Sequence, residues 1–402
     1  MPDDTYVLDL TVTGADQVTV NDDGQGSDTI SVQGIYAKTV EISLCFSAIG
    51  GLTTTAGGYY YDQNGMGHRL VINGLIENAF GSIGHDFIQG NEFANRLFGD
   101  KSITGPGAAD TIWGGLGADT VHGGFGADVI AGDADDDLLF GDIGADTIAG
   151  GTGRDTVEGG AGADRLDGGG SAGDLLSYKS SAAGIQVALT VATMAVGAGG
   201  DAEGDVIRGF LNVMGSAFRD IVSDADKSTL AAHGNDNAFF GGGGRDWLIL
   251  GGGNDSGLGG AEADVIWGEV GDDLISGGNG NDVLRGGMGV DTLTGGAGVD
   301  RFEFRRPNDS PPDLAAQDIV TDFSAVQGDR IGLSAMDADT TLGGNQAFHL
   351  ITTAFTGNPG ALRLVVQGSD LMAMGDIDGD LQADFAILFL GISALTASDF
   401  VL

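Results

Sequence analysis

The sequence predicts an all-β fold in which the chain winds as a β-solenoid in two arrays and closes with a β-rich cap. Fourteen aspartates fall in two runs of seven, and within each run every step is nine residues. Glycines precede most of these aspartates, and an aliphatic residue usually follows two positions later. Such a strict period, with an apolar residue in constant phase, is typical of coils that stack on one another. The aspartates are Asp110, Asp119, Asp128, Asp137, Asp146, Asp155, Asp164, Asp246, Asp255, Asp264, Asp273, Asp282, Asp291 and Asp300.

A short strand is expected directly after each aspartate, with the aliphatic residue in its middle. Strand side chains alternate between two faces, so the middle residue can point inward while its neighbours face solvent. Two repeats then make one coil of eighteen residues with a strand on each side. Aspartates two repeats apart stack in a line at about 4.8 Å, the usual strand spacing. In the first array the inward residues are Ile112, Val121, Ile130, Leu139, Ile148, Val157 and Leu166.

Stacked carboxylates at that spacing repel one another, so a cation between them is expected. Glycine-rich turns tolerate positive φ and expose backbone carbonyls. Carboxylates beside carbonyls make an all-oxygen shell, which suits calcium better than zinc or copper. The sequence therefore predicts Ca²⁺ as the cofactor and all fourteen aspartates as its ligands. A flexible Gly/Asp linker is the competing interpretation, but a linker needs no aliphatic residue in phase.

A known family carries this pattern. The stretch Gly114-Gly115-Leu116-Gly117-Ala118-Asp119-Thr120-Val121-His122 resembles the RTX nonapeptide, Gly-Gly-x-Gly-x-Asp-x-aliphatic-x. The resemblance implies a parallel β-roll in which aspartates and backbone carbonyls hold calcium in the turns.

The region from about residue 300 to 402 resembles the C-terminal domain of serralysins. Matching stretches include Asp318–Phe323, Asp329–Ser334 and Gly375–Asp380, and the end Asp399–Leu402 resembles an uncleaved export signal as well as a last β-strand. The resemblance implies that this domain caps the roll and that a type I secretion exporter is a partner. The protein is then expected to be secreted and extracellular. Capping has a physical basis, because the last coil of a solenoid exposes an apolar cross-section.

The aspartates Asp376, Asp378, Asp380 and Asp384 leave two interpretations open. Their alternation resembles a calcium loop, but the full EF-hand spacing that ends in glutamate is missing. A solvated acidic turn between two strands fits equally well.

Each aspartate array follows a less regular segment of similar layout, which indicates a tandem duplication. We expect a strand-rich N-terminal insert with degenerate repeats at 1–104, the first array at 105–170 and a second strand-rich insert at 171–235. The second array is expected at 236–303 and the serralysin-type cap and secretion domain at 304–402.

Two repeats depart from the pattern. Asn95 takes an aspartate position, so a site there loses a charge. In the repeat around Asp255, Leu250 stands where glycine is expected and Gly257 stands where an aliphatic residue belongs. We expect Leu248 and Leu258 to fill that gap through a local register shift, which makes Asp255 the least regular ligand of its array.

Composition agrees with an extracellular calcium protein. The net charge of -41 makes nucleic acid and anionic membranes poor partners, while 42% hydrophobic residues are too many for a disordered acidic tail. The single Cys45 excludes an intramolecular disulfide, so calcium is expected to replace cross-links. The acidic start lacks the apolar region of a secretory signal peptide, and no apolar run approaches the ~20 residues that span a bilayer.

Catalysis is the rival class of function. The five histidines are scattered and form no His-Glu-x-x-His zinc motif, and we expect no serine-hydrolase elbow. The sequence thus favours a non-enzymatic role in structure, matrix or surface interaction, with extracellular polysaccharide or a cell surface as a further partner. The alternative is a secreted hydrolase or polysaccharide-modifying enzyme, because acidic pairs for sugar chemistry occur throughout the chain.

Overall fold

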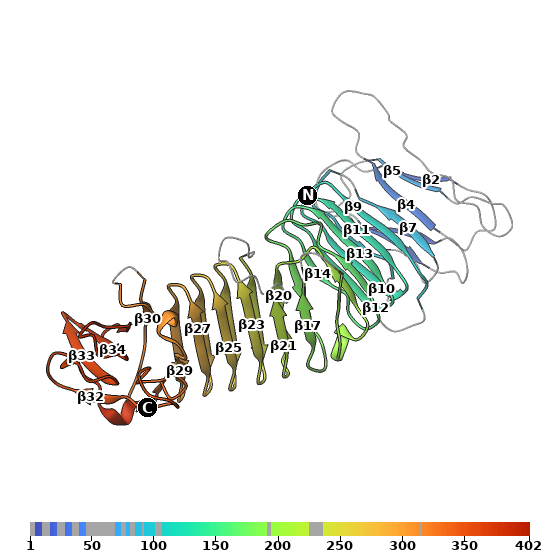
Figure 1. Cartoon of the computed structure of the whole chain (residues 1–402). Helices are drawn as coiled ribbons and strands as arrows, with labels where there is room; N and C mark the ends of the chain where they lie inside the picture. Colours follow the sequence, from blue (N-terminus) through green and yellow to red (C-terminus); the bar gives the residue numbers. More distant parts are fainter. Residues whose placement is uncertain are drawn as a thin grey trace. The chain divides into compact units, whose positions relative to one another are not determined.

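A computed structural model describes residues 85–90, 92–100, 107–190, 194–224, 236–313 and 316–402, together with the backbone of six strands nearer the N-terminus (Figure 1). The predicted all-β fold is confirmed, because the only helical elements in these residues are three single 3-10 turns. These turns are Gly200–Ala202, Pro307–Asp309 and Ala397–Asp399. No helix in the described part of the chain has the length and apolarity to cross a membrane. Predictions about side chains in residues 1–84, Cys45 included, lie outside the described residues.

Contacts divide the chain into two compact units. Unit 1 holds residues 1–181 and 191–212, and unit 2 holds residues 182–190 and 213–402. The five-segment division expected from the sequence is finer than this and stays a prediction.

In unit 1, parallel pairing begins before the first array. The strands nearest the N-terminus are β1 (Thr5–Asp9), β2 (Gln17–Asn21), β3 (Thr29–Gln33), β4 (Val40–Cys45), β5 (Arg69–Asn73) and β6 (Asn78–Phe80). Strand β4 pairs in parallel with β7 (Asp86–Gln89), and β6 does so with β8 (Arg96–Phe98). The N-terminal strands thus continue the two sheets that the array builds.

The first array alternates between two parallel sheets. One sheet takes β10 (Thr120–Gly126), β12 (Leu138–Gly144) and β14 (Thr156–Glu158). The other takes β9 (Thr111–Gly115), β11 (Val129–Ala134), β13 (Thr147–Thr152) and β15 (Arg165–Asp167). Thr120 pairs with Leu138 and Val129 pairs with Thr147, so neighbours in a sheet are eighteen residues apart. The predicted coil of two repeats is therefore present.

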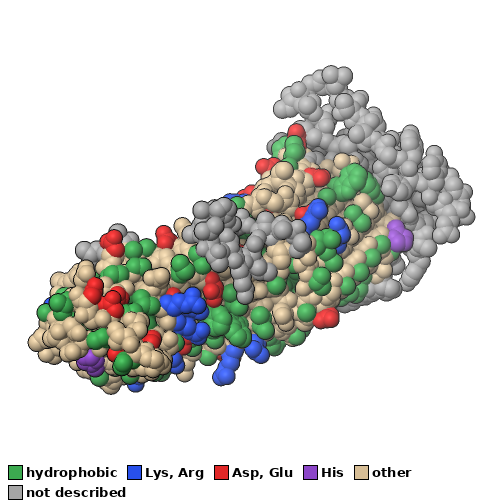
Figure 2. All heavy atoms as spheres, in the orientation of Figure 1, with side chains coloured by type: hydrophobic (Ala, Val, Ile, Leu, Met, Phe, Trp, Pro, Cys, Tyr) green, Lys and Arg blue, Asp and Glu red, His purple; other side chains and the backbone are tan. Residues whose placement is uncertain are grey.

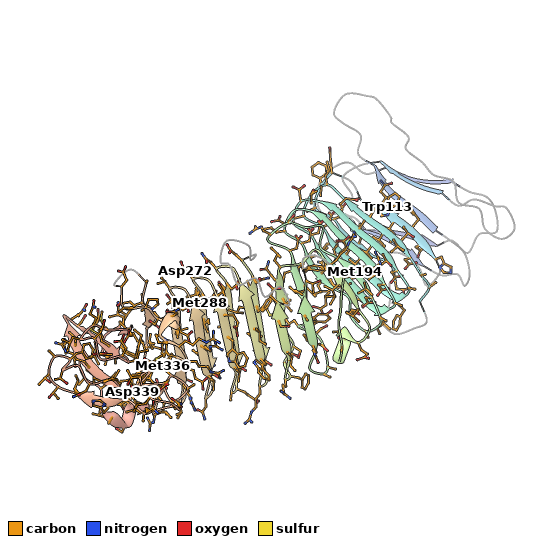
Figure 3. The ribbon with its side chains drawn as sticks, in the orientation of Figure 1. Trp113, Met194, Asp272, Met288, Met336 and Asp339 are labelled. Carbon is orange, nitrogen blue, oxygen red and sulfur yellow. The ribbon has the colours of Figure 1, made fainter. Side chains whose placement is uncertain are left out.

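Unit 1 ends with less regular strands. Leu175–Ser177 forms β16 beside β14, and Val206–Arg208 forms β19 in parallel with β15. The short β18 (Ala195–Val196) pairs with β19 in the antiparallel sense. Figure 3 labels Trp113 on β9, whose ring meets Phe87 edge-on at 4.9 Å between centroids.

Unit 2 repeats the design. One sheet has eight strands: β17 (Gln186–Leu189), β21 (Ile221–Asp224), β23 (Trp247–Gly252), β25 (Val265–Val270), β27 (Val283–Met288), β29 (Arg301–Glu303), β31 (Arg330–Gly332) and β36 (Phe400–Val401). The facing sheet includes β20 (Asn212–Met214), β22 (Ala238–Gly243), β24 (Ser256–Ala261), β26 (Leu274–Asn279), β28 (Thr292–Ala297) and β30 (Asp318–Val320). The end of the chain is thus a strand of the roll, paired through Ile331 and Phe400.

A small antiparallel sheet closes the second roll. Strand β33 (Ala361–Gln367) pairs with β34 (Asp370–Asp376), and β34 pairs with β35 (Phe385–Phe389); the short β32 (His349–Ile351) flanks β33. Strand β35 also pairs in parallel with β30, which joins the cap to the last coils. The rings of Phe323 and Phe389 meet at 5.7 Å between centroids, so aromatic side chains fill the junction.

The core is a stack of the predicted inward residues. All seven aliphatic residues of the first array, from Ile112 to Leu166, are at most 1% exposed. Leu248, Ile266, Ile275, Leu284 and Leu293 are fully buried in the second array. Each coil therefore stabilises the next mainly by apolar contact across parallel strands.

The register shift predicted around Gly257 does not occur. Gly257 keeps its place between Phe239 and Ile275, and Leu258 is exposed on the outer face. Leu250 instead turns inward: it is fully buried, and a Cβ on Gly257 would lie 3.1 Å from its Cδ1. The prediction was wrong because the extra side chain of one repeat fills the space that the next repeat leaves empty.

Candidate metal centre

The fourteen array aspartates form hydrogen-bonded ladders. In each of them, one carboxylate oxygen accepts the backbone N–H of the ladder neighbour in the preceding coil. The Asp110 N–H donates to Asp128 Oδ1 at 2.7 Å, and the Asp128 N–H donates to Asp146 Oδ1 at 2.7 Å. The pattern also runs through Asp255, whose Oδ1 accepts the Asn237 N–H at 2.7 Å. The structure therefore brings all the predicted site residues into one repeated environment.

The second carboxylate oxygen of every one of these aspartates has no partner. All fourteen side chains are at most 3% exposed, and every Oδ2 atom is buried without a hydrogen bond. An unsatisfied buried acceptor costs about 1–3 kcal/mol, and more when it is charged. Because fourteen such oxygens would together destabilise the folded chain strongly, we expect a ligand that binds oxygen beside them.

Glycine lets backbone oxygen approach these carboxylates. A Cβ on Gly114 would lie 2.4 Å from Asp119 Oδ2 and 2.7 Å from the carbonyl oxygen of Gly132. The same contacts recur at Gly259, at 2.3 Å from Asp264 Oδ2 and 2.6 Å from the Gly277 oxygen. A side chain would fill the place where carboxylate and carbonyl oxygens converge. The donor set is all oxygen, as a hard cation requires.

Electrostatics favour a positive charge in the ladders. Burial raises the pKa of Asp110 to about 9, and the carboxylates of Asp86 and Asp128 add to the rise. Burial likewise raises the pKa of Asp146 to about 8, with further contributions from Asp128 and Asp164. Burial raises the pKa of Asp246 to about 8 in the second array. These carboxylates resist ionisation at neutral pH unless a cation offsets their charge.

The ladders continue through aspartates that the nine-residue period does not reach. The Asp164 N–H donates to Asp205 Oδ1 at 2.8 Å across 41 residues, and the Asp291 N–H donates to Asp318 Oδ1 at 3.0 Å across 27 residues. A sequence signal for them exists, since each precedes an aliphatic residue by two positions. The added members are Asp86, Asp174, Asp205, Asp220, Asp318 and Asp329.

Several of these added carboxylates are satisfied by the protein itself. The Tyr178 hydroxyl donates to Asp205 Oδ2 at 2.8 Å, and the Ser171 N–H donates to Asp174 Oδ2 at 2.8 Å. Asp220 and Asp329 receive donors from nearby serines in the same way. Asp318 differs, because its Oδ2 is buried and unpartnered like those of the arrays. At these four aspartates a protein group therefore donates to the Oδ2 atom, whereas in the arrays the Oδ2 atom has no hydrogen-bond partner.

One pentapeptide does match serine-hydrolase spacing, contrary to expectation. Gly169-Gly170-Ser171-Ala172-Gly173 reads Gly-x-Ser-x-Gly. A nucleophile elbow needs a strand, a sharp turn and a following helix. Here the next element is the strand β16, and the Ser171 N–H is bound to Asp174. The segment is a turn of the roll and offers no elbow.

Two family models match the chain. Residues 204–402 match the peptidase M10 serralysin C-terminal domain. Residues 80–102, 105–139 and 140–175 match the RTX calcium-binding nonapeptide repeat. The chain thus carries RTX calcium-binding nonapeptide repeats and a serralysin-type C-terminal domain. RTX nonapeptide repeats bind Ca²⁺, so the predicted cofactor is confirmed, and the β-roll fits the parallel sheets of both units.

Solved structures of similar repeats come from Azotobacter vinelandii. The AlgE6R3 subunit of its mannuronan C5-epimerase is 28% identical over 36% of this chain and 77% of that chain, with a TM-score of 0.27. The AlgE6R2 subunit is 22% identical over 47% of this chain and 91% of that chain, with a TM-score of 0.21. A comparison with curated protein sequences found no match.

Proposed function

We propose that the fourteen array aspartates hold calcium and that calcium binding folds the two rolls outside the cell after type I secretion. The observation that carries this proposal is the row of buried Oδ2 atoms without hydrogen-bond partners, most of which lie near a backbone carbonyl oxygen, as at Gly114 and Gly259. Bound calcium supplies the counter-charge and links carboxylates of successive coils. The serralysin-type C-terminal domain, typical of type I secreted extracellular proteins, supports the route of export.

The charge of the chain explains why folding waits for calcium. At a net charge of -41, self-repulsion opposes collapse, and ordering many glycines costs conformational entropy. Extracellular calcium modules bind with Kd of about 10⁻⁴–10⁻³ M, far above cytosolic calcium. The chain therefore stays largely unfolded inside the cell, a state suited to a narrow export channel.

Circular dichroism tests this proposal. In chelator the full chain should give a mostly disordered spectrum, and β signal should rise cooperatively as calcium is added. Magnesium should substitute poorly, because it demands compact octahedral geometry and dehydrates reluctantly. A spectrum that is fully β in chelator and unmoved by calcium would contradict the coupling of folding to the metal.

For the role of the folded protein, an aromatic surface on unit 2, bordered by arginines, favours binding to an extracellular polysaccharide. These arginines also pair within the protein, Arg305 with Glu303 at 2.9 Å and Arg285 with Glu269 at 3.8 Å. Arg305 lies 5.5 Å and Arg285 6.0 Å from the ring of Trp267, on the outer face of β25–β29, where basic side chains gather (Figure 2). Trp267 also meets Trp247 edge-on at 5.2 Å. Sugar rings stack on aromatic faces, while guanidinium groups pair with carboxylates in two-point contacts.

Binding to a uronate polymer, with a neutral polymer as control, tests this role in saturating calcium. Arg305→Ala should weaken uronate binding several-fold, whereas Arg363→Ala, in the cap, should not. Equal uronate binding by the two variants would contradict the proposal that the polymer binds beside Arg305. New reducing ends or altered sugars in the same mixture would instead favour the alternative, a secreted hydrolase or polysaccharide-modifying enzyme.

A further inference from the structure

The turn between β34 and β35 gathers three carboxylates outside the rolls. Asp376 ends β34, Asp378 lies in the turn, and Asp384 directly precedes β35. Each offers an oxygen, and these three oxygens all lie within 4.8 Å of one another. Ligands of a single calcium ion stand about 2.3–2.6 Å from it, so oxygens on opposite sides of the ion are about 5 Å apart. The spacing thus fits one ion.

A buried, unpartnered oxygen marks this cluster as more than an acidic turn. Asp376 is fully buried, and its Oδ2 has no hydrogen-bond partner. Its Oδ1 accepts the Gly379 N–H at 2.7 Å, which fixes the carboxylate in the turn. A solvated acidic turn would leave such an oxygen in water, where it needs no partner.

The backbone holds the other two carboxylates in place. Asp384 Oδ2 accepts the Ile377 N–H at 2.7 Å, and Asp378 Oδ1 accepts the Asp380 N–H at 3.0 Å. No ion pair found among the described residues includes any of the three carboxylates. The turn therefore collects negative charge in a fixed geometry without a basic side chain to offset it.

We propose that Asp376, Asp378 and Asp384 bind one calcium ion in the cap, separate from the ions of the rolls. Three carboxylates and no nitrogen or sulfur ligand suit calcium rather than zinc. Water and backbone carbonyls complete the shell of six to eight oxygens that calcium takes. The ion ties the end of β34 to the start of β35, and β35 is the strand that pairs with β30 of the second roll.

Asp380 provides a matched control within the same turn. Its carboxylate accepts the backbone N–H of Gln382 at 2.8 Å and the Gln382 side-chain amide at 3.0 Å, and it is not one of the three carboxylates whose oxygens lie within 4.8 Å of one another. Asp378→Asn and Asp380→Asn remove the same charge from two exposed positions that are two residues apart. Only the first removes a ligand.

Counting bound metal in the full chain tests the site. In equilibrium dialysis against radiolabelled calcium at saturating concentration, Asp378→Asn and Asp384→Asn should each hold one ion fewer than the unaltered chain. Asp380→Asn should hold the full number. Equal counts for all four proteins would overturn the proposal.

Hydrogen exchange resolved by peptide then locates the loss. In saturating calcium, Asp378→Asn should speed exchange in peptides that cover residues 376–389 at least several-fold and leave the peptides of both arrays unchanged. Asp128→Asn, a change in the first array, should do the reverse. Unchanged exchange at 376–389 in Asp378→Asn would show that no ion orders this turn.

Discussion

At the scale of single residues, each array aspartate divides its two oxygens between two tasks. Oδ1 takes a backbone N–H of the preceding coil, as Asp146 does from Asp128 at 2.7 Å, and so fixes the side chain. Oδ2 is buried and has no hydrogen-bond partner, so it is available to a cation. An asparagine could keep the first task, because its side-chain oxygen also accepts a hydrogen bond, but it loses the charge needed for the second.

Asp128→Asn should therefore weaken two calcium sites while the coil keeps its register. Asp128 is a ladder neighbour of both Asp110 and Asp146. Seven aspartates in a row give five pairs two repeats apart, so two arrays give ten. Calorimetric titration should find on the order of ten weak sites, with two of them lost or weakened at least several-fold in the variant. Asp136→Asn, an exposed partner of Arg154, serves as control. Saturation at one or two ions would contradict the hypothesis that each pair of aspartates two repeats apart binds an ion.

Tyr178 shows how a ladder ends without an ion. Its hydroxyl donates to Asp205 Oδ2, and burial beside that carboxylate raises the pKa of Tyr178. Tyr178→Phe leaves the Asp205 oxygen buried and unpaired, which should destabilise the folded protein by about 1–3 kcal/mol. Denaturant unfolding in saturating calcium measures this. No change in stability, together with one additional bound ion, would mean that calcium takes the place of the hydroxyl.

At the scale of elements, the nine-residue period predicted the alternation of strands, because each repeat carries its own turn, aspartate and inward residue. The period could not predict Asp205, which follows Asp164 by 41 residues, because an insert loops out while the sheet stays in register. The buried position of the Leu250 side chain could not be predicted for another reason. Its inward turn depends on the empty space at Gly257, which belongs to the next repeat.

Replacing Leu250 tests this compensation between neighbouring strands. Leu250→Ala should open a cavity beside Gly257 and lower the free energy of unfolding by about 2–5 kcal/mol. Leu258→Ala should cost little, because Leu258 is 42% exposed. Denaturant unfolding of both variants in saturating calcium gives the comparison. An equal decrease in the free energy of unfolding in both variants would instead support the register shift, in which Leu258 fills the space at Gly257.

At the scale of the whole molecule, protons and calcium compete for the same carboxylates. The pKa of Asp110 rises to about 9 and those of Asp146 and Asp246 to about 8 in the folded chain without metal, from an ordinary value of 3.8. The folded state then binds protons more tightly than the unfolded state does. The free energy of unfolding of the calcium-free chain must therefore rise as the pH falls from about 9 towards 4.

Saturating calcium removes that dependence, because bound ions hold the ladder carboxylates ionised in the folded state. In calcium-free buffer, β signal in circular dichroism should grow as the pH is lowered from 8 to 5, since protonation removes the repulsion along each ladder. Over the same range, the calcium concentration at half-folding should decrease, because protons bound to the folded chain already supply part of the stabilisation. Magnesium at equal ionic strength controls for screening. A calcium-free spectrum that does not change between pH 8 and 5, or a calcium midpoint independent of pH, would show that ladder carboxylates do not control folding.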